Sequence, residues 1–174
     1  MASDVPETLT LKRNRDRESS RELVGRRIGV VLVCAFLVLG LLNVFGQRPA
    51  TSSAANPTAK LKVYAPKRVR GGLYYEARFT IDALADLKSA TIVLDPGWSE
   101  SITINTVEPS PVGEASRDGK LAFDLGHIPK GDSYIFFLQL QVNPTNIGHR
   151  SQDVWLYDGE TELLHIDRSI TIWP

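Results

Sequence analysis

The sequence predicts an all-β fold, a two-sheet β-sandwich, preceded by a single transmembrane α-helix. Two observations lead to this prediction. Residues 28–46 form an uncharged, apolar stretch long enough to cross a bilayer as a helix. From Lys60 onward, apolar and polar residues alternate with period two, and turn motifs separate the alternating runs. A chain of 174 residues has room for one ordinary domain beside the helix.

The composition excludes several classes of protein. With 43% hydrophobic and 23% charged residues, the chain is neither disordered throughout nor collagen-like nor a coiled coil. Twenty Lys and Arg balance twenty Asp and Glu, so the basic excess typical of nucleic-acid-binding proteins is missing. The single cysteine, Cys34, excludes a disulfide framework and a multi-cysteine zinc site.

Residues 1–27 predict a basic cytoplasmic tail that is mostly disordered, with room for a short helix just before the membrane. The segment is polar, has no hydrophobic periodicity, and carries more Lys and Arg than Asp and Glu. Behind the apolar stretch, Arg48 is the nearest basic residue. Because Lys and Arg collect on the cytoplasmic side of membrane helices, we expect a cytoplasmic N-terminus and an extracytoplasmic C-terminal domain.

The apolar stretch from Ile28 to Gly46 is interpreted as the transmembrane helix. As a helix it would rise about 28 Å, close to the thickness of the hydrocarbon core. A signal peptide has an apolar region of only roughly 7–15 residues, so an uncleaved anchor is favoured over cleavage and secretion. Small residues and one amide share a face of this helix, which is typical of helix–helix packing in membranes. The face consists of Gly29, Val33, Phe36, Gly40 and Asn43.

Residues 47–59 are rich in Ala, Ser, Thr and Pro and predict a linker, which leaves 60–174 as the β-sandwich domain. About eight strands are expected. The clearest ones cover 73–81 and 134–142, and Asp158-Gly159 is the strongest hairpin motif. Arg168 interrupts an apolar run, which predicts a bulge, a sheet edge or a guanidinium that reaches the rim. The residues expected to face the core in the two clearest strands are Leu73, Tyr75, Ala77, Phe79, Ile81, Tyr134, Phe136, Leu138, Leu140 and Val142.

Two segments of the domain resemble a known family. Residues 119–132, which read Gly-Lys-Leu-Ala-Phe-Asp-Leu-Gly-His-Ile-Pro-Lys-Gly-Asp, lead into the strand over 133–142, and residues 69–75 lead into an earlier strand. This pattern is similar to that of bacterial extracellular immunoglobulin-like domains of the conserved-repeat or CARDB-like type. The resemblance covers 60–174 and implies an immunoglobulin-like β-sandwich that serves as a spacer or binding surface.

Residues with catalytic or metal-binding chemistry form no recognised motif. His127, His149 and His165 lack the short spacing of metal ligands, and there is neither a Gly-x-Ser-x-Gly turn nor a phosphate-binding loop. No catalytic, cofactor-binding or metal-binding residue is therefore predicted. The alternative left open is a small envelope enzyme or metal-binding protein that uses the three histidines and the acidic residues between 153 and 167. Those acidic residues are Asp153, Asp158, Glu160, Glu162 and Asp167.

Charge is distributed unevenly over the domain. Segment 60–78 contains six basic residues and one acid, Glu76, and predicts a surface for a partner or for lipid headgroups. The alternative is that this basic segment and the acidic segment 153–167 are simply solvated. The six are Lys60, Lys62, Lys67, Arg68, Arg70 and Arg78. We therefore expect a non-enzymatic binding module or accessory subunit of a membrane or envelope complex. Its expected partners are the lipid bilayer and an envelope protein, with no cofactor, nucleic acid or small-molecule substrate.

Overall fold

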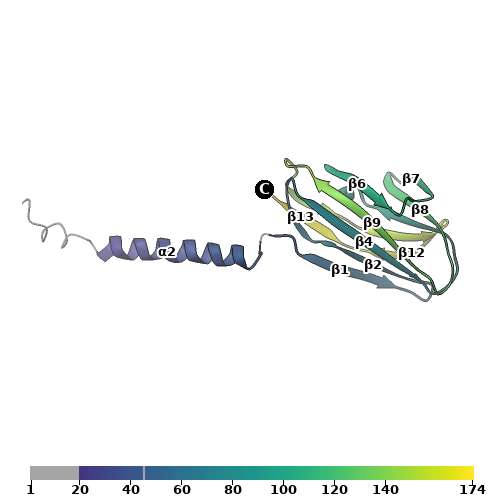
Figure 1. Cartoon of the computed structure of the whole chain (residues 1–174), viewed down its shortest axis with the longest axis horizontal. Coiled ribbons are helices and arrows are strands. Elements are labelled where there is room, and N and C mark those ends of the chain that lie inside the picture. The colour runs from purple at the N-terminus through teal and green to yellow at the C-terminus, as the bar shows by residue number, and fades with distance from the viewer. Residues whose placement is uncertain (1–19, 45) are drawn as a thin grey trace, which may run out of the picture. The chain divides into compact units, whose positions relative to one another are not determined.

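The computed structural model describes residues 20–44 and 46–174, which form an N-terminal helix and a separate β domain (Figure 1). The predicted fold class, a β-sandwich preceded by one long apolar helix, is confirmed. Most of the predicted disordered tail lies outside the described residues. Residues 20–27 are helical and continue directly into the apolar stretch, at the place where the sequence left room for a short helix.

Helix α2 extends over Ser20–Leu41, and its part from Glu22 to Leu41 is long and apolar enough for a signal sequence or a membrane anchor. It ends before Gly46, where the predicted helix ended. Asn43 has a positive φ of 52°, its N–H bonds to Gly40 O, and the Val44 N–H bonds to Leu39 O. This pair of bonds is a Schellman cap, and Asn tolerates the left-handed position that the cap requires.

The end of the helix corrects the predicted packing face. Gly29, Val33, Phe36 and Gly40 lie within α2, but Asn43 is the capping residue beyond it. The amide therefore does not continue the helical spacing of the other four residues. Helix–helix packing through those four stays a prediction.

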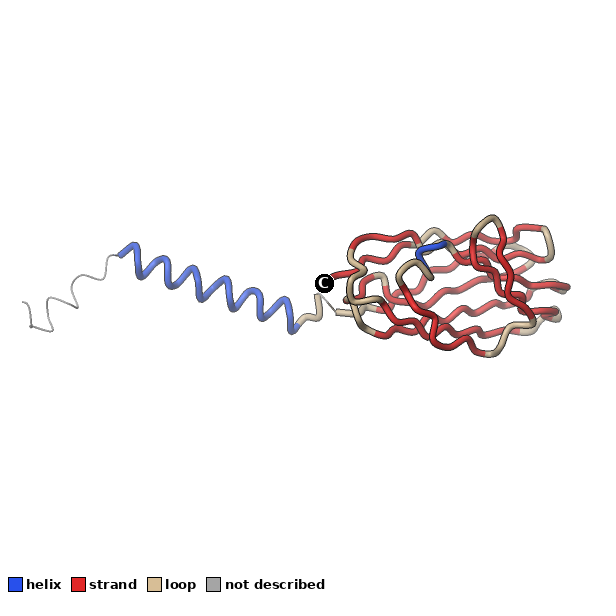
Figure 2. Tube along the Cα trace, turned by 90° about the horizontal axis from the view of Figure 1, so that it is seen from above, coloured by secondary structure: helices blue, strands red, loops and turns tan. Residues whose placement is uncertain are grey.

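Thirteen strands and one 3₁₀ turn make up the described β domain, seen from a second side in Figure 2. In chain order they are β1 (Pro49–Ala55), β2 (Ala59–Pro66), β3 (Arg68–Arg70), β4 (Tyr74–Ala83), β5 (Leu87–Leu94), η2 (Pro96–Trp98), β6 (Ile102–Glu108), β7 (Gly113–Arg117), β8 (Lys120–Ile128), β9 (Ser133–Val142), β10 (Gly148–Ser151), β11 (Val154–Asp158), β12 (Thr161–Ile166) and β13 (Ser169–Trp173).

The strands form three sheets. Sheet A has the order β1-β2-β4-β9-β6, and sheet C has the order β12-β11-β5-β8-β7. The short sheet B, β10-β13-β3, contains the parallel pair β13 and β3. All pairs in sheets A and C are antiparallel. The inner faces of sheets A and C meet in one apolar core, which is the sandwich arrangement.

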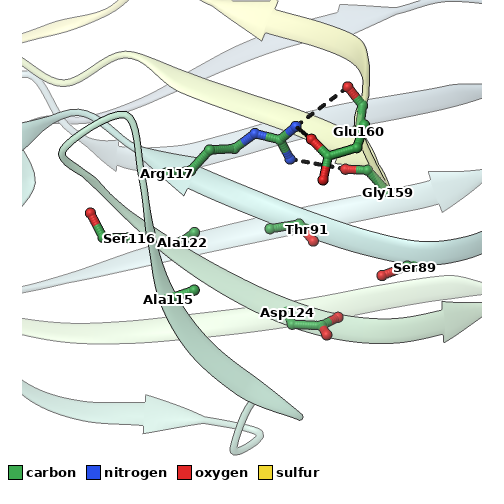
Figure 3. Close-up of a pocket in the computed structure, with 9 residues that line it drawn as sticks. All are labelled: Ser89, Thr91, Ala115, Ser116, Arg117, Ala122, Asp124, Gly159 and Glu160. Carbon is green, nitrogen blue, oxygen red and sulfur yellow. Dashed lines mark hydrogen bonds and ion pairs between the residues drawn. The ribbon is translucent and has the colours of Figure 1, made fainter.

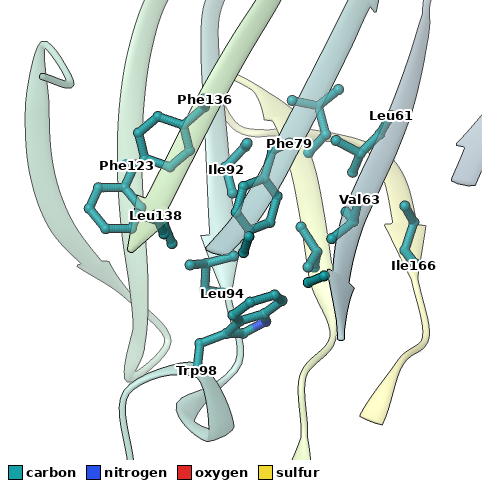
Figure 4. Packing of buried hydrophobic residues seen from close by; sticks show 14 of the residues in the cluster. Leu61, Val63, Phe79, Ile92, Leu94, Trp98, Phe123, Phe136, Leu138 and Ile166 are labelled. Atoms are coloured by element: carbon teal, nitrogen blue, oxygen red, sulfur yellow. The ribbon is translucent and has the colours of Figure 1, made fainter. Parts of the chain in front are cut away.

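Aromatic rings join the two layers at the centre of the core (Figure 4). Phe79 of β4 and Phe136 of β9 belong to sheet A, and Phe123 of β8 belongs to sheet C. The Phe136 ring lies 5.9 Å from Phe79 and 5.1 Å from Phe123, and Trp98 of η2 lies 5.4 Å from Phe79. Such tilted pairs bury much apolar area in a favourable ring geometry.

Alternating burial confirms the two clearest strand predictions. In β4, and in β9 from Phe136 onward, every second residue is buried, and the buried set differs from the predicted one at three positions. Leu73 precedes β4 and is exposed, Tyr134 is only half-buried, and Ala83 is buried although it was not predicted. In the final run, Leu164, Ile166, Ile170 and Ile172 are buried, as their spacing indicated.

The predicted linker 47–59 is largely a strand. Strand β1 pairs with β2 along its whole length, from Pro49 opposite Pro66 to Ala55 opposite Lys60. Asn56 then turns the chain, because its Oδ1 accepts hydrogen bonds from the N–H groups of Thr58 and Ala59. The domain therefore begins before Lys60, and residues 42–48 are what joins α2 to β1.

Candidate functional site

The proximal end of the sandwich, where the chain enters β1, contains exposed apolar and basic side chains. We use this name for residues 46–49, 70–74, 144–147 and 173–174. Gln47 Nε2 donates to Tyr74 O at 2.7 Å, and Arg70 Nε donates to Pro174 O at 3.3 Å. The Gly71 N–H donates to Trp173 O, so these segments lie together. The C-terminus is at this end as well (Figure 1).

Four large apolar side chains are exposed at the proximal end. Tyr74 is 57% exposed, Ile147 52%, Leu73 44% and Trp173 40%. Aromatic rings beside basic residues are typical of protein surfaces that meet lipid headgroups. These residues carry no joint signal in the sequence, because their strands and loops converge only in the fold. Leu73 was even assigned to the core.

The six predicted basic residues do not form one surface. Arg70 lies at the proximal end, and Lys67 and Arg68 immediately precede it at the start of β3. Lys60 is paired with Ala55, at the opposite end of β2 from Pro66, and Lys62 is on the same outer face two residues further along. Three of the six residues therefore lie at or beside the proximal end, and two lie toward the other end of β2.

Arg78, the sixth residue, lies in the middle of the outer face of sheet A. Its guanidinium is 3.4 Å from Glu76 Oε1 and lies over the rings of Tyr64 and Phe137, at 5.7 Å and 5.2 Å from their centroids. These contacts fix the Arg78 side chain on the outer face of sheet A. It is not part of the proximal end.

A hollow of about 320 Å³ lies between the β7–β8 hairpin and the turn at Gly159 (Figure 3). Arg117 crosses it and donates to Gly159 O at 2.9 Å, and it also forms an ion pair with Glu160. The same guanidinium lies 4.0 Å from the centroid of the Tyr157 ring. Arg117 therefore connects the β7–β8 hairpin with the β11–β12 hairpin.

The charged side chain of Arg168 is buried against the ring of Trp98. Arg168 is 6% exposed, and its Nη2 donates to Ala65 O and Pro66 O at 3.4 and 3.3 Å. Its guanidinium carbon lies 5.0 Å from the centroid of the Trp98 ring. Of the three alternatives given for Arg168, the guanidinium that reaches the rim is wrong, because these carbonyl groups and the ring hold it inside. Burial lowers the pKa of Arg168 to about 10, since desolvation disfavours the charged form.

The three histidines lie apart. His127 Nε2 is 2.8 Å from Asp86 Oδ1, and His149 Nδ1 is 3.2 Å from Thr171 Oγ1. His165 has two acidic neighbours, Asp153 and Asp167. The alternative of an enzyme or metal site built from these histidines therefore finds only His165 beside two of the acidic residues.

A register shift brings His165 to Asp153. Strands β11 and β12 pair Asp158 with Thr161, but a bulge between Leu156 and Tyr157 then pairs Trp155 with His165. The inward positions Val154 and Ile166 are buried. Residues alternate between the two faces of a strand, so Asp153, Trp155 and His165 lie on the outer face. Of the predicted acidic residues, Asp153 and Asp167 are thus brought together, while Asp158, Glu160 and Glu162 stay near the hairpin turn.

Comparisons with known proteins concern the type of fold. No family model matches the chain, and no curated protein matches it. The solution structure of the CARDB domain of a Pyrococcus furiosus protein is 8% identical, with a TM-score of 0.42 over 74% of this chain and 98% of that chain. A crystal structure of that domain in complex with di-metal ions is 13% identical, with a TM-score of 0.39 over 69% of this chain and 98% of that chain.

A further similar structure is the sporulation control protein Spo0M from Bacillus subtilis. It is 12% identical, with a TM-score of 0.40 over 67% of this chain and 50% of that chain. At this level of similarity the comparisons assign no ligand, partner or activity to this chain.

Proposed function

We propose that the protein is a single-pass membrane protein whose extracytoplasmic β-sandwich is a non-enzymatic binding module or accessory subunit of an envelope complex. The observation that carries the proposal is the junction of the apolar helix with the proximal end. Only residues 42–48 separate Leu41 from Pro49. A chain of that length reaches roughly 25 Å when fully extended, so the proximal end is tethered near the lipid headgroups.

The side chains at the proximal end suit that position. Trp173 and Tyr74 offer amphipathic rings, and Arg70 adds a positive charge. Aromatic residues are enriched at membrane interfaces, and each Lys or Arg near an anionic surface contributes about 1 kcal/mol. The outer faces of sheets A and C stay available to a protein partner.

Topology and anchoring can be tested by cysteine labelling. Cys34 is first replaced by Ser, and one new cysteine is placed either at Ser99 in the domain or at Ser3 in the tail. A membrane-impermeant maleimide applied to intact cells should label the Ser99→Cys chain. It should label the Ser3→Cys chain only after the cells are permeabilised.

Cleavage is tested on the same samples. The intact mass of the chain from washed membranes should include residues 1–46. A shorter mature chain in the soluble fraction would show that the helix is a signal sequence and would overturn the anchor.

Contact with lipid is tested in bilayer nanodiscs that hold the full chain. Lipids with brominated acyl chains near the headgroup should quench the fluorescence of Trp173, and anionic lipid should increase this quenching. The double substitution Lys67→Gln with Arg70→Gln should reduce the effect of anionic lipid. The matched control, Lys60→Gln with Lys62→Gln, changes the same charge at the other end of β2 and should leave it unchanged. Equal effects of the two pairs would refute the lipid-facing orientation.

The accessory-subunit part of the proposal needs a partner test. The native chain is cross-linked in its own membrane, beside a chain in which an unrelated membrane helix replaces α2 and residues 45–174 are kept. A stoichiometric partner of both chains would place the binding surface on the sandwich. A partner of the native chain alone would place it on the helix, and no partner of either would refute the subunit role.

A further inference from the structure

Three metal-ligating side chains converge at one corner of sheet C, outside the surfaces discussed above. Asp153 precedes β11, His165 lies in β12, and Asp167 follows β12. His165 Nε2 is 3.6 Å from Asp153 Oδ2 and 3.5 Å from Asp167 Oδ1. One ligand atom from each residue lies within 4.8 Å of the other two.

These distances differ from those of a hydrogen-bonded histidine. A charge-assisted N–H···O bond is about 2.7–2.9 Å long, as His127 and Asp86 show at 2.8 Å. The His165 nitrogen is too far from either carboxylate for such a bond and almost equally far from both. Two ligands bound to Zn²⁺ at about 2.0–2.2 Å in tetrahedral geometry are about 3.3–3.6 Å apart. The two separations from His165 Nε2 match this spacing.

Asp153 is held firmly in place. Its Oδ1 accepts the Arg168 N–H at 2.9 Å, which leaves Oδ2 directed to His165. Its carbonyl oxygen accepts the Asp95 N–H at 3.1 Å and the Trp98 indole N–H at 3.3 Å. Outer contacts of this kind fix the orientation of metal ligands in known sites.

The ring of His165 is oriented as well. It stacks on Trp155 with a centroid distance of 4.6 Å and an interplanar angle of 2°. Asp167, whose side chain is 89% exposed, is the adjustable ligand. A rotation of that exposed side chain can bring its carboxylate oxygen closer to the other two ligand atoms.

We propose that Asp153, His165 and Asp167 bind one divalent transition-metal ion of the zinc type, with water completing its coordination. One imidazole nitrogen and two carboxylate oxygens suit Zn²⁺ or Co²⁺, whereas Ca²⁺ and Mg²⁺ prefer oxygen ligands alone. The site is independent of the proposed membrane role, so either can fail without the other. A bound ion would fasten the β12–β13 connection to the start of β11.

The test is a metal titration of the full chain in detergent, purified without a histidine tag. Calorimetry should show one Zn²⁺ bound per chain, with Mg²⁺ and Ca²⁺ at least about tenfold weaker. Co²⁺ should quench the fluorescence of Trp155, and the quenching should be reversed by Zn²⁺. His165→Gln should weaken Zn²⁺ binding at least about tenfold, whereas the matched control His127→Gln should bind as the native chain does.

Two results would overturn the proposal. One is equal Zn²⁺ affinity of the native and His165→Gln chains, and the other is a native chain that binds no Zn²⁺. If His165→Gln does not fold, as judged by far-UV circular dichroism, Asp167→Asn answers the same question. This exposed side chain has no packing role, so unchanged Zn²⁺ affinity in Asp167→Asn would count against the site.

Discussion

Tyr75 should make the domain less stable at alkaline pH. The side chain is buried in β4, and its hydroxyl accepts a hydrogen bond from Gln152 Nε2 at 3.1 Å. Burial raises the pKa of Tyr75 to about 12, because desolvation of the phenolate outweighs the hydrogen bond from Gln152 and the charge of Arg168. In the unfolded chain the pKa is the ordinary value of about 10.

The sign and size of the effect follow from this difference. Between pH 10 and 12 the folded state keeps a proton that the unfolded state has lost, so stability falls as the pH rises. At pH 11 the loss is about 1.4 kcal/mol, and above pH 12 it approaches about 2.7 kcal/mol. At pH 7 both states are protonated and the loss is absent.

The substitution Tyr75→Phe removes this dependence. At pH 7 the variant should be less stable by about 1 kcal/mol, because Gln152 Nε2 loses its nearer acceptor and keeps only Gly97 O at 3.4 Å. At pH 11 the native chain loses about 1.4 kcal/mol that the variant does not, so the order of stability should be equalised or reversed.

Urea unfolding of the full chain in detergent, followed by far-UV circular dichroism at both pH values, measures this change. Tyr74→Phe is the matched control, since that side chain is exposed and should show the same difference from the native chain at pH 7 and pH 11. The reasoning is refuted if Tyr75→Phe shifts the free energy of unfolding by the same amount at both pH values.

Three further substitutions test the packing of the sandwich, each by urea unfolding of the full chain. Gly97→Ala should cost more than about 3 kcal/mol, because the new Cβ would lie 1.9 Å from Ser151 O, whereas Gly113→Ala has 4.0 Å of space and should be nearly neutral. Phe136→Ala should cost about 3–5 kcal/mol, because it opens a cavity between the two layers, and a loss below 1 kcal/mol would contradict the packing described. Asn56→Ala should cost about 2 kcal/mol, since its side chain satisfies two backbone N–H groups and a carbonyl of β12; no loss would mean that the turn holds without it.

The sequence predicted the sandwich well where hydrophobicity alternates. Strands β4 and β9 are the central pair of sheet A, and their inward residues, such as Phe79 and Phe136, stood out by period alone. Strand β1 gave no such signal. Its Ala, Ser and Thr side chains differ little in hydrophobicity, and its neighbour β2 supplies the register. Composition alone therefore indicated a linker.

The candidate metal site could not be predicted from spacing. Twelve positions separate Asp153 from His165, and a regular hairpin closing at Asp158 and Thr161 would have placed Val154, not Trp155, opposite His165. The bulge beside Leu156 shifts the register by one residue and sets Trp155 opposite His165. The alternation of Leu164 and Ile166 indicates which face His165 takes, but it does not indicate which residue of β11 lies opposite.

Strand β1 also determines how the domain would bear mechanical load. In an anchored chain, tension from the membrane enters the fold at Pro49 and runs along β1 toward Ala55. When the opposing force acts at the far end of the sandwich, the ladder between β1 and β2 is loaded in shear. The hydrogen bonds of its seven residue pairs then resist the force together and do not break one after another. In an anchored chain, the weakly hydrophobic first strand would therefore be the element that resists unfolding of the domain from its N-terminus.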